Sequence, residues 1–279
     1  MIVAAQDVRA RATANAPFLA GLIAREFADE ALLADGGALP VARRLRIERR
    51  HVAREVALGD LSGALDLTAV TQRLTRFADA SLDTAIRTAI AERTPGAAAI
   101  GFAALALGKQ GSFELNYSSD IDPILIYDPA TLPCRAREEP GDAAVRIARR
   151  VLELLQTRDA DGYVLRVDLR LRPSPEITPL AVPVDAAIAY YESQALPWER
   201  AAFIRARAAA GDLALGQRFL DTIRPFIWRR SLDFGAVGDG IANDRDAFIA
   251  ADAAANGGEI LVPDGVYFLA ADTAIKAPV

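Results

Sequence analysis

Two aspartates separated by one residue, Asp120 and Asp122, stand directly ahead of the apolar run ILIY. Side chains two apart on a strand share a face, so the two carboxylates would be presented together. Such a pair suits a hard divalent cation such as Mg²⁺, which takes one or two protein carboxylates together with phosphate oxygens and water. Two solvated aspartates at a strand edge are the alternative, although aspartate is depleted in strands.

The stretch GKQGS, residues 108–112, lies a few residues upstream. Gly108 and Gly111 allow a tight turn that would bring backbone amides and the Ser112 hydroxyl close to a phosphate, with Lys109 adding a positive charge. The spacing does not match the P-loop, which has four residues between its first glycine and Gly-Lys-Ser/Thr. Taken alone, the turn is a weak indication of phosphate binding.

A third carboxylate comes from the stretch LRVDLRLR, whose strict alternation predicts a strand ended by Pro173. Its polar face would carry Arg166, Asp168, Arg170 and Arg172, and its other face would be apolar. A solvated sheet face has this pattern too. A single acid among arginines is also what a metal ligand beside phosphate-binding guanidinium groups requires.

The composition of the chain excludes several classes of protein and site. The 279 residues carry a formal net charge of −5, which argues against a nucleic-acid binder. One cysteine, Cys134, excludes an intrachain disulfide and a thiolate zinc cluster. One histidine, His51, lies far from the aspartates, which leaves no Ser-His or Cys-His pair near them. No apolar run approaches the length of a transmembrane helix, so we expect a cytoplasmic protein without membrane contact.

Hydrophobic periodicity predicts an α+β fold in four parts. Residues 1–95 form a helical region, in which one apolar stripe is expected to face the core. Residues 96–182 form the core, with strands at the apolar run before Gly108, at 120–129 and at 162–173, and a helix at 141–157. Residues 183–233 are predicted to be a helical extension, and residues 234–279 a glycine-rich segment of short strands. The apolar stripe comprises Leu67, Val70, Leu74, Phe77, Leu82 and Ile86.

The stretches GKQGSFELNYSSDIDPILIY, GYVLRVDLRLRP, YYESQALPWERAAFIRARAAAGD and RPFIWRRSLDF together resemble the N-terminal, adenylyl-removing half of the bacterial glutamine synthetase adenylyltransferase/adenylyl-removing enzyme. The resemblance covers most of residues 15–234. It implies a nucleotidyltransferase core of the DNA polymerase β type with flanking helices. Gln110, Phe113 and Pro123 differ from the residues common in that family.

The resemblance also implies a reaction, in which inorganic phosphate removes AMP from a tyrosine of adenylylated glutamine synthetase and forms ADP. Asp120, Asp122 and Asp168 would hold Mg²⁺, and Gly111 and Ser112 would form the phosphate-facing turn. Gly108 would share that turn, and Lys109, Arg170 and Arg172 are our physical extension to the phosphate oxygens. The family's regulation implies a PII signal protein as a further partner.

The C-terminal stretch FGAVGDGIANDRDAFIAADAAANGGEILVPDGVYFL instead resembles the opening of a pectate-lyase-type parallel β-helix protein. One coil of such a fold cannot bury its own core. The sequence therefore suggests a fusion, and a divergent adenylyl-removing domain with an unrelated tail is the alternative. Three other functions stay open: a nucleotidyltransferase with another acceptor, an inactive or chimeric fragment, and a carbohydrate-active protein.

Overall fold

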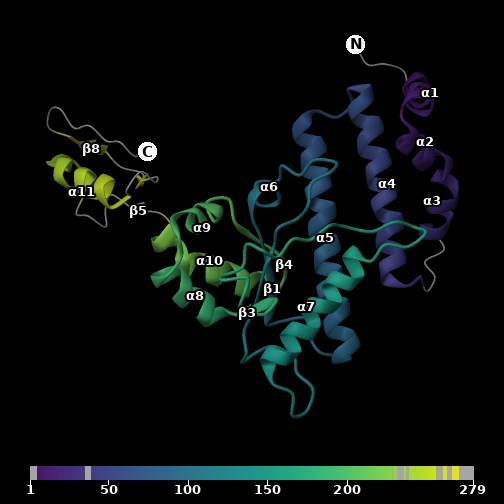
Figure 1. Ribbon diagram of the computed structural model, residues 1–279. Coiled ribbons are helices and arrows are strands. Elements are labelled where there is room, and N and C mark those ends of the chain that lie inside the picture. The colour runs from purple at the N-terminus through teal and green to yellow at the C-terminus, as the bar shows by residue number, and fades with distance from the viewer. Residues whose placement is uncertain are drawn as a thin grey trace. The chain divides into compact units, whose positions relative to one another are not determined.

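The computed structural model describes residues 5–34, 39–227, 229–230, 236, 239–255, 260–262 and 266–269. Two compact units divide the chain: Met1–Ala187 with Arg205–Arg218, and Ile188–Ile204 with Phe219–Val279. All of the aspartates, glycines and arginines singled out above lie in the first unit. Its mixture of helices and a sheet agrees with the expected α+β class (Figure 1).

The first unit begins with a helical region, as the periodicity predicts. Asp66 caps the fifth helix by accepting a hydrogen bond from the amide of Ala69 at 2.7 Å, and Gly63 ends the fourth helix in the left-handed conformation at φ 73°. Figure 1 shows the two long helices running side by side. The five helices are α1 (Ala5–Asn15), α2 (Pro17–Ala24), α3 (Glu26–Ala34), α4 (Val41–Ser62) and α5 (Leu67–Arg93).

Arginines spaced four apart on α4 tie this helix to its neighbours. Arg54 is almost fully buried and donates to Glu30 at 2.9 Å, and Arg50 forms an ion pair with Asp29 on α3 at 2.6 Å. Arg46 reaches the loop after α7 (Pro140–Gln156) and pairs with Asp159 there at 2.6 Å. Since buried charges need partners, these contacts fix where α4 lies.

The apolar stripe expected on α5 is mostly confirmed. Val70, Leu82 and Ile86 are buried, and small residues between them let α5 pack closely against α4 and α7. Leu67 was a wrong prediction, because its side chain is 78% exposed. It occupies the first turn, directly after the Asp66 cap.

A four-stranded sheet of order β3-β2-β1-β4 forms the rest of the first unit. β1 pairs antiparallel with both β2 and β4, and β2 pairs parallel with β3. Every residue of β1 and β2 is buried, as continuous apolar strands in the middle of a sheet require. The strands are β1 (Phe102–Ala106), β2 (Ile124–Tyr127), β3 (Ala181–Pro183) and β4 (Arg207–Gly211).

Two predictions about strands were wrong. Residues 207–211 were expected to be helical but form β4, because pairing with β1 overrides the helix preference of the sequence RAAAG. The close approach is visible at Gly211, where a Cβ would lie 2.2 Å from the Phe102 carbonyl oxygen. The strand expected at 162–173 is reduced to two isolated bridges, a parallel one between Ile121 and Val167 and an antiparallel one between Asp159 and Gly162, and the chain turns away before Pro173.

The second unit contains an aromatic cluster and a small terminal segment. Tyr191 packs edge-on against Phe203 and Phe219, with ring centroids 4.6 and 6.1 Å apart. Its further elements include two parallel strand pairs, β5 with β7 and β6 with β8. The elements from 184 onward, apart from β4, are α8 (Val184–Ser193), α9 (Pro197–Ala202), α10 (Leu213–Ile227), β5 (Arg229–Arg230), β6 (Asp239–Asn243), α11 (Arg245–Ala255), β7 (Ile260–Leu261) and β8 (Val266–Phe268).

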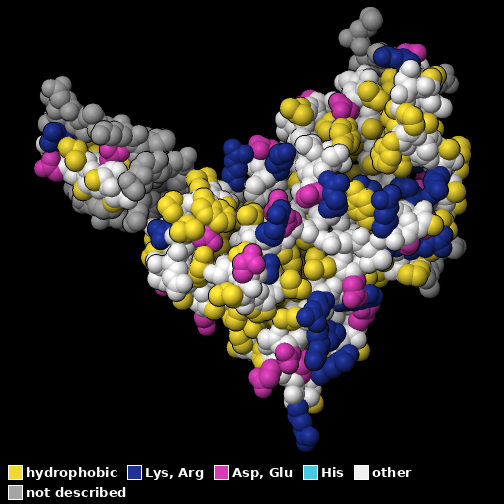
Figure 2. All heavy atoms as spheres, viewed as in Figure 1, with side chains coloured by type: hydrophobic (Ala, Val, Ile, Leu, Met, Phe, Trp, Pro, Cys, Tyr) yellow, Lys and Arg dark blue, Asp and Glu magenta, His cyan; other side chains and the backbone are white. Residues whose placement is uncertain are grey.

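The β-helix resemblance of the C-terminal stretch stays a prediction. Residues 231–235, 237–238, 256–259, 263–265 and 270–279, which include much of its glycine-rich sequence, lie outside the described residues. Helices long and apolar enough to cross a membrane are absent from the described part of the chain. On the face shown in Figure 2, basic side chains are interspersed with acidic ones over the helices of the first unit.

Candidate active site

The bridge between Ile121 and Val167 sets the positions of the three aspartates. The Ile121 amide donates to the Arg166 carbonyl at 3.0 Å, and the Asp168 amide donates to the Ile121 carbonyl at 2.9 Å. Ile121 is buried in the core with Val167 packed against that core. In this parallel register Asp120 lies beside Arg166 and Asp122 lies beside Asp168, with their side chains on the face away from the core.

The three carboxylates have different surroundings. Asp120 pairs with the guanidinium of Arg166, which also donates to the Ser118 carbonyl. Asp168 accepts from Arg170 Nε at 2.7 and 2.9 Å, and these hydrogen bonds lower its pKa. Asp122 has no hydrogen-bond partner among the described residues. Burial raises the pKa of Asp122 above its usual range, and the charges of Asp168 and Asp120 raise it further.

Carboxylate oxygens are the ligands that hard divalent cations take, so the three aspartates are a candidate cation site. Within the described residues, no three His, Cys, Asp or Glu side chains are already grouped around a point that could hold a metal ion. The donor set nevertheless fits a divalent cation, because the repulsion that raises the pKa of Asp122 is what such an ion would relieve. Asp120 and Asp168 would exchange Arg166 and Arg170 for the ion.

The GKQGS stretch forms a short helical turn, α6 (Gly108–Gly111), directly after β1. Gly108 adopts φ 53°, which favours glycine, and space is open where its Cβ would be. At Gly111 a Cβ would lie 2.0 Å from the carbonyl oxygen of Arg205, so only glycine fits against the turn that precedes β4. Lys109 is exposed, while the Ser112 hydroxyl donates to Glu114 at 2.9 Å.

Arg207 on β4 holds this turn in place, and sequence reasoning missed it. Its Nη2 donates to the Gln110 carbonyl at 2.9 Å and to Asp79 on α5 at 2.7 Å, and its Nε donates to the Gly111 carbonyl at 3.2 Å. The guanidinium also lies 3.9 Å from the centre of the Phe113 ring. Arg207 was not predicted from the sequence because its segment was expected to be helical. With β4 recognised as the neighbour of β1, an arginine at its start would have been a candidate.

Two other singled-out residues have structural environments. The guanidinium of Arg172 donates to the carbonyls of Leu169 and Pro175, both at 2.7 Å, so it is engaged within its own loop. Pro123 is buried between the Ile121 bridge and the first residue of β2. Because the ladder begins at Ile124, the missing amide of Pro123 removes no strand hydrogen bond.

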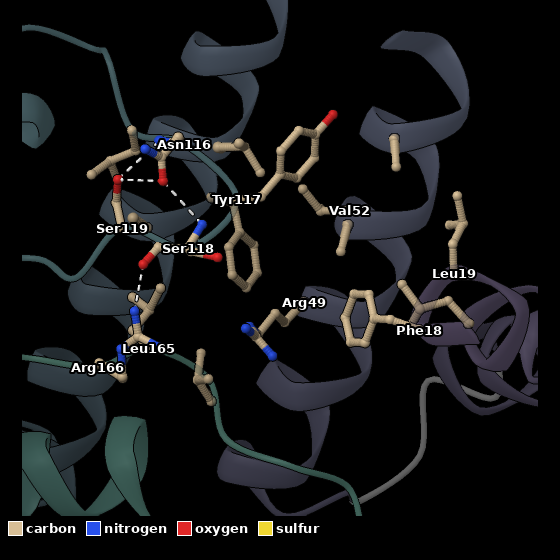
Figure 3. A pocket seen from close by; sticks show the side chains of 18 of the residues that line it. Phe18, Leu19, Arg49, Val52, Asn116, Tyr117, Ser118, Ser119, Leu165 and Arg166 are labelled. Carbon is tan, nitrogen blue, oxygen red and sulfur yellow. Dashed lines mark hydrogen bonds between the residues drawn. The ribbon is translucent and has the colours of Figure 1, made fainter. Parts of the chain in front are cut away.

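A cavity of about 520 Å³ lies close to Asp120, since the preceding residue Ser119 and the ion-pair partner Arg166 line it. Figure 3 shows Asn116, Ser118, Ser119 and Arg166 along one side, Phe18, Leu19 and Val52 along the other, and Tyr117 and Arg49 between them. Arg166 belongs both to this wall and to the ion pair with Asp120. None of the three aspartates lines the cavity, and Asp120 is connected to it through Arg166.

Comparison with known proteins places the chain in a family. The profile of the glutamate-ammonia ligase adenylyltransferase family matches residues 10–222. The chain belongs to this family. The match includes every aspartate of the site and all four strands of the main sheet, and it ends before the C-terminal segment with the different sequence character.

Curated relatives from this enzyme family support the assignment. The bifunctional glutamine synthetase adenylyltransferase/adenylyl-removing enzyme of Caulobacter vibrioides is 48% identical over 223 residues, which are 76% of this chain and 23% of the relative. Its counterparts in Xanthobacter autotrophicus and Rhizobium meliloti are each 44% identical, over 80% and 74% of this chain and 24% and 22% of the relatives. The chain thus spans about a quarter of the length of these relatives.

Proposed function

We propose that the chain is a magnesium-dependent nucleotidyltransferase domain that removes AMP from the adenylylated tyrosine of glutamine synthetase by phosphorolysis. The observation that carries the proposal is the register at Ile121 and Val167, in which Asp120 and Asp122 lie on one face with Asp168. Family membership supports the nucleotidyl chemistry, and the relatives' names supply glutamine synthetase as the partner. A PII signal protein as a regulatory partner rests on the sequence resemblance.

The proposed reaction exchanges a phosphoester bond to tyrosine for a phosphoanhydride bond in ADP. An oxygen of inorganic phosphate forms a bond to the phosphorus of the adenylyl group, and the bond from that phosphorus to the tyrosine oxygen breaks. The tyrosine oxygen takes up the proton that the attacking phosphate releases. The products are ADP and the free tyrosine, so atoms and charge balance without a further reactant.

The residues of this chain would bind and orient the reacting groups. Asp120, Asp122 and Asp168 would hold Mg²⁺, which when bound would neutralise charge on the phosphate oxygens. Lys109 and Arg170 are exposed cations that would contact phosphate oxygens, beside the backbone of Gly108, Gly111 and Ser112. Arg172 would act by holding the loop that follows Asp168, since its donors are engaged there.

An assay for ADP tests the proposal. The chain is incubated with adenylylated glutamine synthetase, Mg²⁺ and inorganic phosphate, and ADP is quantified with time. Asp122→Asn should reduce the rate about 10²–10³-fold, the cost of removing one preorganised electrostatic contact to the transition state. Asp142→Asn, an exposed aspartate in the first turn of α7, is the matched control and should retain the rate. Equal rates for the two variants would refute the assigned site.

One observation favours a second candidate, a domain that binds nucleotide without turning it over. Asp120 and Asp168 already carry arginine partners, which compete with a cation for both carboxylates. If ADP binds to the chain and no ADP forms from the adenylylated substrate, this second candidate is favoured over the first.

A further inference from the structure

The cavity close to Asp120 has one strongly apolar wall. Phe18 and Leu22 from α2 and Val52, Ala53 and Leu61 from α4 contribute to it. Phe18 is 69% exposed, so a large aromatic side chain stands at the cavity with little covering it. A volume of about 520 Å³ falls within the range of about 300–1,000 Å³ that small-molecule sites occupy.

The opposite wall is polar and held in shape by its own hydrogen bonds. The Asn116 side chain accepts from the Ser118 amide at 3.0 Å and from the Ser119 hydroxyl at 2.9 Å. Tyr117 donates its hydroxyl hydrogen to Asp60 on α4 at 2.9 Å. Burial and the charge of Asp60 raise the pKa of Tyr117, so the phenol stays protonated and keeps this contact. The ring of Tyr117 is thereby fixed against the cavity before a ligand arrives.

The charges at the cavity favour an anionic ligand. Arg49 stacks over the Tyr163 ring at 4.4 Å from its centre, and Arg166 lines the wall nearest Asp120. The lining contains one carboxylate, Asp60, which is engaged by Tyr117. Because Arg166 is paired with Asp120, Arg49, which has no carboxylate partner among the described residues, is the positive charge that this side offers to a ligand.

These features call for a ligand with a flat apolar ring system joined to a negatively charged group. A small polar amino acid would leave the apolar wall unfilled, and an acyl chain would leave the positive charge of Arg49 without a partner. The adenylyl group in the relatives' names has both parts. Its phosphate would be directed toward the aspartates, because Arg166 joins the cavity to Asp120.

We propose that this cavity is the binding site for the adenosine part of the adenylyl group, with Phe18 and Tyr117 contacting the base. The inference rests on the proposed function and adds to it the place and the residues of base recognition. A nucleotide base of any identity can stack on an aromatic side chain, and the affinity is higher when the ring is already held in place before the ligand binds.

Calorimetric titration of the chain with ADP in the presence of Mg²⁺ tests the inference, with inorganic pyrophosphate as a ligand that lacks the base. Phe18→Ala should weaken ADP binding at least fivefold and leave pyrophosphate binding unchanged. Phe27→Ala is the matched control, since Phe27 is 84% exposed on α3 and does not line the cavity. It should bind both ligands as the unaltered chain does.

A pair of alanine-to-phenylalanine variants, one inside the cavity and one outside it, gives a second measurement. Ala53→Phe places a ring inside the cavity and should weaken ADP binding at least tenfold, whereas Ala80→Phe on the exposed face of α5 should have no effect. Circular dichroism of each variant shows whether its helices are retained.

The outcomes separate the inference from the proposed function. ADP affinity unchanged in both Phe18→Ala and folded Ala53→Phe would overturn the inference, even if the unaltered chain forms ADP from its substrate. ADP binding that depends on both residues, in a chain that forms no ADP, would sustain the inference and refute the proposed function. If the unaltered chain binds no ADP, the inference fails.

Discussion

Replacing Arg207 by methionine should destabilise the first unit and loosen the GKQGS turn. Methionine keeps much of the length of the side chain but removes three donated hydrogen bonds, to Asp79, Gln110 and Gly111. Arg207 and Asp79 are only 22% and 17% exposed, so the carboxylate would lose its cation in a largely buried site. Removing one partner of a buried ion pair costs about 3–5 kcal/mol in the free energy of unfolding. We expect about 3 kcal/mol here, because both side chains keep some exposure to solvent.

The pH dependence of this destabilisation follows from Asp79. Burial raises the pKa of Asp79 above its usual range, although Gln110 and Arg207 both lower it. Without Arg207 the pKa rises further. A carboxyl group whose pKa is higher in the folded state destabilises the fold when ionised, and this penalty disappears as the pH falls toward the unfolded pKa of about 3.9. The difference in stability between the variant and the unaltered chain should therefore shrink from pH 7 toward pH 4.

Urea unfolding followed by far-ultraviolet circular dichroism measures this difference, because α4 and α5 in the first unit are long helices. Arg73→Met, at an exposed position of α5, is the matched control and should change stability by less than about 0.5 kcal/mol. In an Asp79→Asn background, Arg207→Met should show no such pH dependence. An effect of Arg207→Met equal to that of Arg73→Met at pH 7 would refute the role given to Arg207.

Three further substitutions follow from the same geometry. Gly111→Ala should destabilise the first unit by more than about 2 kcal/mol in thermal unfolding, because its Cβ would lie 2.0 Å from the Arg205 carbonyl oxygen and overpack the site. Gly21→Ala on α2, where space for a Cβ is open, is the control and should be neutral or stabilising. Asp122→Asn should keep or raise the midpoint of thermal unfolding at pH 7, since the ionised carboxylate is disfavoured there, and any gain should vanish as the pH falls toward 4; a lower midpoint at pH 7 would contradict the raised pKa. Tyr117→Phe should cost about 1 kcal/mol through loss of the bond to Asp60, and an unchanged urea midpoint would show that this bond does not hold the loop.

Sequence patterns predicted the helical region and the two central strands because each is determined locally. The apolar residues of α5 recur at helical spacing, and β1 and β2 are uninterrupted apolar runs. The segment RAAAG carries no such information. Alanine favours helices, and its strand conformation comes from hydrogen bonds to β1, a partner about a hundred residues earlier in the chain.

In the candidate site, too, local sequence patterns predicted some residues and could not predict others. Spacing predicted a site at Asp120 and Asp122, and alternation added Asp168, but the strand expected around Asp168 makes only one bridge to Ile121. The arginine partners of Asp120 and Asp168, and the contacts of Arg207 with the turn, depend on how distant segments meet. No periodicity in the sequence encodes them. The cavity could not be predicted from the sequence either, because α2, α4, α5 and two loops each contribute part of its wall.

Transfer of labelled phosphate tests the central claim most directly. The chain is incubated with adenylylated glutamine synthetase, Mg²⁺ and inorganic phosphate labelled with ³²P, and the nucleotides are separated. Phosphorolysis at the aspartate site predicts that the label appears in the β-phosphate of ADP, and that Asp122→Asn slows its appearance about 10²–10³-fold while Asp142→Asn does not. Release of unlabelled AMP, or labelled ADP formed equally by the Asp122→Asn variant, would contradict the account.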